Sequence, residues 1–280
     1  MICLMGKQEE KYNIVTEAEN LHRAGNFAKA ETIYRKVLQG NPKHSEALRL
    51  LGLLAHQTGN SEQGINLILQ AINAQPENVE AHFNLGIIKL DHNLAGEAIG
   101  AFRAALSISP KNYACLVNLG NALVIAEDFS EAIKQSNLAL EIDPDNVEAL
   151  SNLGNALSKS GKLTDAMSIL RRTVLLRPND SQLFNNLGII EQTIGLIESA
   201  NRTYEEALRI NPQCQRAERN LLINTLNLPN QKSDSLFEVR RGYGMKYNRH
   251  NLDSNKFSNR NKEIKRKLRI GYLSSDFHAH

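Results

Sequence analysis

The sequence contains no tryptophan, and aromatic residues make up only 5% of its 280 positions. No apolar run approaches the roughly 20 residues needed to cross a bilayer. The N-terminal MICLMGKQEEKYN lacks the basic region and the longer apolar stretch of a signal peptide. These absences predict a cytoplasmic chain without a membrane span. The prominence of leucine, isoleucine and alanine favours a helix-rich fold.

Cysteine is also scarce. Cys3, Cys115 and Cys214 lie far apart and form no CxxC or Cys/His spacing, which argues against a disulfide scaffold, a redox pair or a metal site. The glycines form no phosphate-binding loop. Six histidines show no metal-ligand spacing: His22, His44, His56, His82, His92 and His250. We therefore expect no metal, no cofactor and no catalytic constellation within the repeats described below.

Acidic and basic residues are unevenly distributed. Residues 1–228 carry 21 basic and 25 acidic side chains, a net charge of −4, whereas residues 229–280 carry 12 basic and 5 acidic, a net charge of +7. A basic, asparagine-rich tail is compatible with contact to nucleic acid or an anionic membrane, and equally with a solvated linker. No aromatic stacking pattern accompanies the charges, so the interpretation as a linker is preferred.

Proline is rare and regularly spaced. Six of the seven prolines follow one another at intervals of 34 residues: Pro42, Pro76, Pro110, Pro144, Pro178 and Pro212. The same interval separates a column of small residues: Ala18, Gly52, Gly86, Gly120, Gly154 and Gly188. It also separates Ala30, Gly64, Ala98, Ala132, Ala166 and Ala200. A fixed period of this length indicates stacked supersecondary units.

Each unit is expected to be a pair of helices. In residues 147–180 the first helix is predicted from about Val147 to Ser160 and the second from about Leu163 to Leu176, with Gly161 in the turn and Pro178 ending the helix. Small residues at the two columns let the paired backbones approach closely. One pair cannot bury its apolar face alone, whereas stacked pairs make a continuous core.

This pattern resembles the tetratricopeptide repeat, and the resemblance implies an all-α, right-handed α-solenoid. After an N-terminal tail (1–10), the solenoid is expected over 11–228. It comprises six repeats and a capping helix: 11–44, 45–78, 79–112, 113–146, 147–180, 181–214 and 215–228. Repeat 1 departs most from the pattern, as an end unit that faces water often does.

Asparagine recurs at the sixth position of the first helix, on the side predicted to line a concave groove. The five residues are Asn84, Asn118, Asn152, Asn186 and Asn220, and Asn121 and Asn155 join them at the ninth position. Asparagine is a poor helix former, but its amide both donates and accepts hydrogen bonds, which suits an extended peptide backbone. We predict that unstructured protein segments bind this asparagine ladder. The alternative is that the amides hold neighbouring repeats together.

Other partners are weaker predictions. A clamp for a peptide's C-terminal carboxylate needs a Lys/Asn/Arg set on consecutive first helices, which no trio of repeats supplies. Repeat 1 offers Val15 and Glu19 instead, and a glutamate repels a carboxylate. The solenoid surface also offers a route to self-association.

The period is lost after Pro229. Residues 229–267 are expected to form one more helix and a basic, asparagine-rich linker. LRIGYL (268–273) then has the character of a short strand, followed by SSDFHAH. Repeats with an asparagine ladder, a basic linker and LRIGYLSSDFHAH together resemble the O-linked N-acetylglucosamine transferase family. Asp276, Phe277 and His280 match its D-F-x-x-H segment.

That resemblance implies that residues 268–280 begin a catalytic half with two Rossmann-like lobes. The family transfers N-acetylglucosamine from UDP-N-acetylglucosamine to Ser/Thr of proteins without a metal, and His280 matches a histidine of its active site. Because the catalytic half is missing after His280, we expect this chain to be inactive alone. Two hypotheses stay open: the substrate-recognition arm of such a transferase, as a fragment or frameshift product, or a stand-alone adaptor.

Overall fold

The computed structural model describes residues 14–227, and within them every regular element is a helix. Residues 14–23 are helical. The twelve helices that follow are α2 (Phe27–Gly40), α3 (Ser45–Gln57), α4 (Ser61–Ala74), α5 (Val79–Asp91), α6 (Ala95–Ile108), α7 (Tyr113–Ile125), α8 (Phe129–Ile142), α9 (Val147–Lys159), α10 (Leu163–Leu176), α11 (Ser181–Thr193), α12 (Ile197–Ile210) and α13 (Gln215–Asn227). The predicted all-α solenoid is confirmed. The expected strand at 268–273 and His280 lie outside the described residues.

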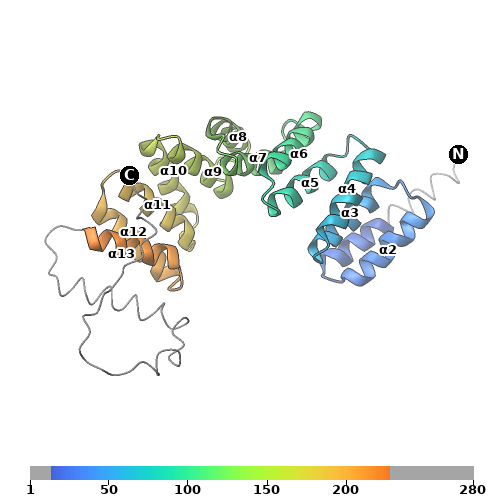
Figure 1. Ribbon diagram of the computed structural model, residues 1–280, viewed down its shortest axis with the longest axis horizontal. Coiled ribbons are helices and arrows are strands. Elements are labelled where there is room, and N and C mark those ends of the chain that lie inside the picture. Colours follow the sequence, from blue (N-terminus) through green and yellow to red (C-terminus); the bar gives the residue numbers. More distant parts are fainter. Residues whose placement is uncertain (1–13, 228–280) are drawn as a thin grey trace, which may run out of the picture. The chain divides into compact units, whose positions relative to one another are not determined.

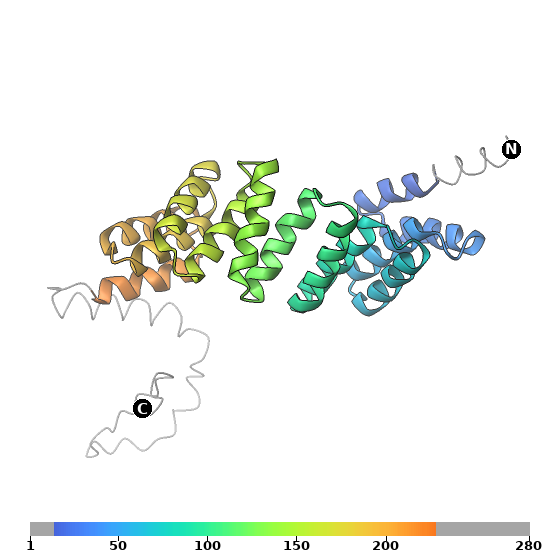
Figure 2. The same ribbon diagram turned by 90° about the horizontal axis from the view of Figure 1, so that it is seen from above.

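The helices pack in chain order. Each helix from α2 to α11 contacts the next, and residues 14–23 share a buried cluster with α2 (Figures 1 and 2). The first helices of successive repeats also contact one another, as α3 does α5, α5 does α7, and α7 does α9. These first helices therefore form one continuous surface of the solenoid.

Side-chain caps start most of the first helices at the same place in the period, two residues after each proline. Asn78, Asn112 and Asn146 each accept a hydrogen bond from the backbone N–H three residues on, at 2.9, 3.0 and 2.8 Å. Such caps satisfy a helix N–H that would otherwise lack a partner and are worth about 1 kcal/mol each. The chain after each proline thus begins a new helix at a fixed position.

The turn between the two helices of a repeat uses the left-handed backbone region. Residues at 34-residue intervals have positive φ there: Gly25, Gly59, Asn93, Glu127, Gly161 and Gly195. Glycine adopts this region without steric cost, but other residues do not. Glu127, at φ 62°, is therefore a strained position in repeat 4.

In repeats 3 and 6 a glycine of the small-residue column lies against an aromatic ring of the second helix. A Cβ added to Gly86 would lie 2.5 Å from the ring of Phe102, and one added to Gly188 would lie 2.5 Å from the ring of Tyr204. Phe102 and Tyr204 are fully buried. Glycine is needed because these rings of the second helix lie directly on the backbone of the first.

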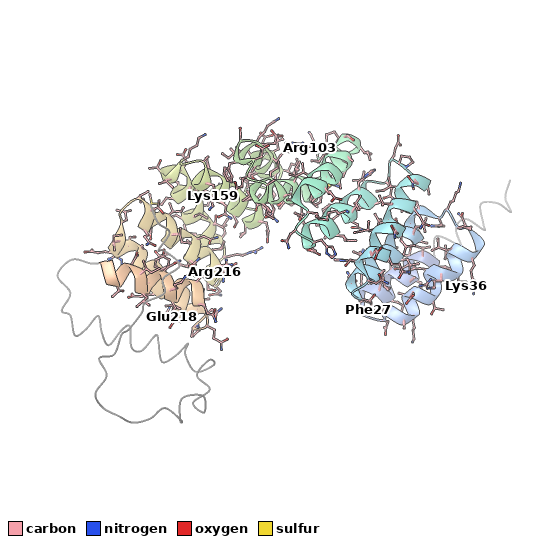
Figure 3. The ribbon with its side chains drawn as sticks, in the orientation of Figure 1. Phe27, Lys36, Arg103, Lys159, Arg216 and Glu218 are labelled. Carbon is pink, nitrogen blue, oxygen red and sulfur yellow. The ribbon has the colours of Figure 1, made fainter. Side chains whose placement is uncertain are left out.

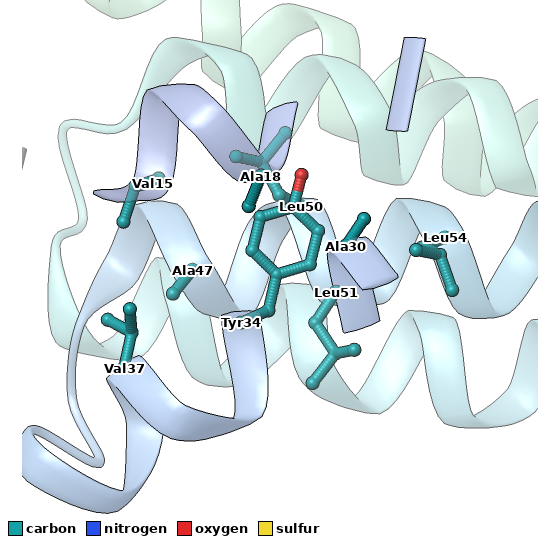
Figure 4. Close-up of a cluster of buried hydrophobic side chains, with 9 residues drawn as sticks. All are labelled: Val15, Ala18, Ala30, Tyr34, Val37, Ala47, Leu50, Leu51 and Leu54. Carbon is teal, nitrogen blue, oxygen red and sulfur yellow. The ribbon is translucent and has the colours of Figure 1, made fainter. Parts of the chain in front are cut away.

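The core is a chain of clusters, each shared by neighbouring helices. In the first cluster the buried ring of Tyr34 lies among aliphatic side chains from repeats 1 and 2 (Figure 4), namely Val15, Ala18, Ala30, Val37, Ala47, Leu50, Leu51 and Leu54. Charged side chains such as Lys36, Arg103 and Lys159 are exposed on the helices (Figure 3). Buried clusters such as this one join neighbouring repeats, as the sequence pattern predicted.

Candidate functional site

The asparagines at the sixth position do not share one environment. Asn84 is only 6% exposed, and its amide nitrogen is buried without a hydrogen-bond partner among the described residues. The sequence pattern predicts this side chain on an open groove, but Asn84 is buried. Asn84 belongs to α5, which contacts the first helices on both sides of it, α3 and α7.

Two members of the ladder bond to the preceding repeat. Asn152 Nδ2 donates to the main-chain oxygen of Val117 at 3.0 Å, from α9 to α7. Asn220 Nδ2 donates to Oδ1 of the buried Asn185 at 3.1 Å, from α13 to α11. In these two residues one end of the amide holds neighbouring first helices together, which is the alternative that the sequence left open.

Within residues 14–227 the four remaining members form no hydrogen bond to another repeat, and one of them is exposed. Asn118 is half-buried, and its Nδ2 donates to Ala114 O of its own helix at 2.9 Å. Asn155 and Asn186 are half-buried, and Asn121 is exposed. The amides available to a guest are therefore concentrated on α7, α9 and α11.

An open pocket of about 330 Å³ lies where these helices meet. It brings together Asn118 and Asn121 of α7 with Ser151 and Asn152 of α9. Its apolar wall consists of Val117, Val147 and Leu183, and its charged lining residues are Glu148, Arg177 and Asp180. We call this the asparagine pocket. Three of the seven predicted ladder residues line it: Asn118, Asn121 and Asn152.

Fixed charges surround the asparagine pocket. Arg177 Nη2 donates to Glu148 Oε1 at 2.7 Å. Asp180 accepts a hydrogen bond from the backbone N–H of Gln182 at 2.9 Å and so caps α11. Burial raises the pKa of the nearby Tyr113 hydroxyl, and the carboxylates of Asp143 and Glu148 raise it further.

A second pocket, of about 520 Å³, has a different lining. It lies between repeats 1 and 2, where the ladder positions hold Leu50 and Leu53 beside Phe27 (labelled in Figure 3). His22 forms part of the wall, with Nε2 2.7 Å from Gln57 Oε1. Charged residues also line this pocket, namely Glu19, Arg23 and Arg49, and no asparagine of the ladder does.

The structure also brings together three residues that no sequence motif connects. His56 Nδ1 lies 2.9 Å from Ser61 Oγ, and His56 Nε2 lies 2.9 Å from Asp91 Oδ2. We predicted no catalytic constellation in the repeats, and this Ser–His–Asp chain has the residue types of one. The 35-residue separation of His56 and Asp91 is also that of His22 and Gln57 one repeat earlier. We therefore interpret it as a link between repeats.

Comparison with protein families explains the regularity of this architecture. A family model described as tetratricopeptide repeat matches residues 21–86 and 123–187, and a second model with the same description matches residues 181–214. The chain is a tetratricopeptide-repeat protein. In the part of this tetratricopeptide-repeat protein that the structure describes, none of the helices has both the length and the apolar character needed to span a bilayer.

Solved structures share this fold at low sequence identity. The type IV pilus biogenesis factor PilW matches with a TM-score of 0.68 and 17% identity, over 75% of this chain and 98% of that one. PilF of Pseudomonas aeruginosa matches with a TM-score of 0.67 and 14% identity, over 76% and 97%. YrrB, a tetratricopeptide-repeat protein with an unusual peptide-binding site, matches with a TM-score of 0.58 and 21% identity, over 66% and 96%.

A comparison with curated proteins gives no match. The segment 268–280, which carries the resemblance to the O-linked N-acetylglucosamine transferase family, lies outside both the described residues and the ranges that the family models match.

Proposed function

We propose that this protein is a scaffold that binds extended polypeptide segments of other proteins through the asparagine pocket. The observation that carries the proposal is the convergence of Asn118, Asn121 and Asn152 from two consecutive first helices on one open pocket. Every residue of an extended chain presents one N–H and one C=O that need partners. Amide side chains supply both kinds of partner in a small volume.

The hydrogen bonds already made inside the protein support this use. Asn152 commits its Nδ2 to Val117 O, which fixes the side chain and leaves its oxygen as an acceptor. Asn121 is exposed, so both ends of its amide are available to a guest. A side chain that is held in place before binding loses less entropy when the ligand arrives. By analogy, peptide binding is also supported by the similar tetratricopeptide-repeat protein YrrB, which has an unusual peptide-binding site.

The proposal is tested by removing single amides that are not needed for the fold. Asn121→Ala should weaken binding of a fluorescently labelled unstructured peptide by about three- to ten-fold, the value of one or two lost hydrogen bonds. The matched control is Asn137→Ala, because Asn137 is an exposed asparagine on the second helix α8. Fluorescence anisotropy measures the peptide affinity of both variants. Equal affinities of the two variants would contradict the proposal.

We propose, as a second and finer function, that the repeats are the recognition arm of an O-linked N-acetylglucosamine transferase-like protein. The support is the sequence LRIGYLSSDFHAH at 268–280, with Asp276, Phe277 and His280 in the family's motif. Sequencing the gene past the His280 codon distinguishes this from an adaptor: an open frame encoding a second nucleotide-binding lobe supports the transferase, and a stop codon supports the adaptor.

A further inference from the structure

The charges that line the asparagine pocket are unequal. Glu148 and Arg177 are bonded to each other at 2.7 Å and so neutralise one another. The third charged residue, Asp180, uses Oδ1 to cap α11, and no side chain in residues 14–227 pairs with its Oδ2. One negative charge on the lining therefore has no counter-charge.

The rest of the lining suits a particular kind of side chain. Val117, Val147 and Leu183 offer an apolar wall beside the carboxylate. Lysine and arginine combine a long apolar stem with a positive head, and they bury the stem along apolar surface while the head stays near water or a charge. A glutamate or aspartate would be repelled by Asp180. A purely apolar side chain would cover the amides of Asn118 and Asn152 without giving them partners.

We infer that the asparagine pocket receives a lysine or arginine side chain of the bound polypeptide, with its positive head next to the Asp180 carboxylate. This inference rests on the proposed peptide binding and adds its selectivity: the partner is an extended segment that carries basic residues. The N-terminal end of the α11 dipole offsets part of the charge on Asp180. The selectivity is consequently a matter of a few-fold in affinity rather than of orders of magnitude.

The first measurement compares three labelled peptides that differ only in their central residues, which are lysine, glutamine or glutamate. At low ionic strength the wild-type protein should bind the lysine peptide most tightly and the glutamate peptide most weakly. Added salt should reduce the difference, because it screens exposed charges. Equal binding of the lysine and glutamate peptides would overturn the charge inference but leave peptide binding itself intact. No binding of any of the three would overturn both.

The second measurement assigns the selectivity to one carboxylate. Asp180→Asn removes the charge but keeps a side-chain oxygen that can still cap the helix. The variant should bind the lysine peptide about three- to five-fold more weakly and the glutamine peptide nearly unchanged.

The matched control is Asp128→Asn. Asp128 caps α8 by accepting from Glu131 N at 3.2 Å, but it does not line the pocket. Its replacement should change the affinity for the lysine peptide by less than about two-fold. Equal losses in the two variants, or none in Asp180→Asn, would show that Asp180 does not select the basic side chain. A thermal melt of each variant confirms that both remain folded.

Discussion

Asn152 of α9 donates its amide hydrogen to the main-chain oxygen of Val117 in α7, at 3.0 Å. The two residues belong to consecutive repeats, so this bond fixes one first helix against the next. The same side chain lines the asparagine pocket. One residue therefore both links two repeats and lines the candidate site, and the contributions of the ladder asparagines to stability should differ from residue to residue.

Asn152→Ala should lower the free energy of unfolding by about 1 kcal/mol, because it removes a hydrogen bond between repeats. Asn118→Ala should leave it unchanged or raise it slightly, since Asn118 Nδ2 bonds only within its own helix and alanine is the better helix former. Urea denaturation followed by circular dichroism compares the two. Equal destabilisation of both variants would mean that the link from Asn152 to Val117 adds nothing.

Gly188→Ala should destabilise the protein by about 1–3 kcal/mol, because its new Cβ would lie 2.5 Å from the buried ring of Tyr204. Gly100 of α6 is the matched control: a Cβ there meets nothing within 4 Å. Gly100→Ala should stabilise by up to about 1 kcal/mol through the better helix propensity of alanine. A lower melting temperature for Gly188→Ala together with a higher one for Gly100→Ala would confirm the close packing at Gly188.

Glu127→Gly should stabilise the protein by roughly 1 kcal/mol, because Glu127 has φ 62° and glycine adopts that backbone without strain. Asn93→Gly, at the equivalent turn one repeat earlier, should have a smaller effect, since asparagine tolerates the left-handed region better. The melting temperatures of the two variants and of the wild type, measured in parallel, test this order. A lower melting temperature for Glu127→Gly would show that its side chain, rather than its backbone, governs this turn.

Glu191 is a buried carboxylate, only 2% exposed, that links repeats 5 and 6. It accepts hydrogen bonds from Ser199 Oγ at 2.9 Å and Thr203 Oγ1 at 2.7 Å, and Arg171 lies 3.3 Å away. Glu191→Ala should cost about 1–3 kcal/mol of stability, because both hydroxyls lose their acceptor. Arg171→Ala should cost less than about 1 kcal/mol, since that guanidinium is half-exposed. Denaturant titration of both variants tests the order.

Alkaline pH should weaken the fold partly through Cys115. Burial raises the pKa of this thiol from 9.0 to about 12. Above about pH 9 the thiol ionises in the unfolded chain but not in the folded one, so the free energy of unfolding falls as pH rises from about 9 towards 12 and is unaffected below. Cys115→Ala should therefore lose less stability than the wild type between about pH 8 and pH 11. Parallel losses in both proteins would argue against the shift.

The architecture could be predicted because it depends on residues that act locally and recur in every repeat. Proline at 34-residue intervals ends each second helix, and small residues such as Gly86 and Gly188 allow the paired helices to touch. The second helix expected from Leu163 to Leu176 is found at those bounds. These features follow from backbone stereochemistry and helical periodicity, which a single unit already encodes and every further unit repeats.

The sequence by itself therefore determined the helix pairs, their stacking and the residues that repeat on one face. Only the tertiary structure decided which of those residues are open to a partner. Asn84 is covered and Asn152 is shared with Val117, whereas Asn121 is exposed and Asp180 joins the pocket from a neighbouring loop. The physical reason is that exposure and pairing depend on contacts between non-identical repeats, and a 34-residue period carries no information about how two different units fill the space between them.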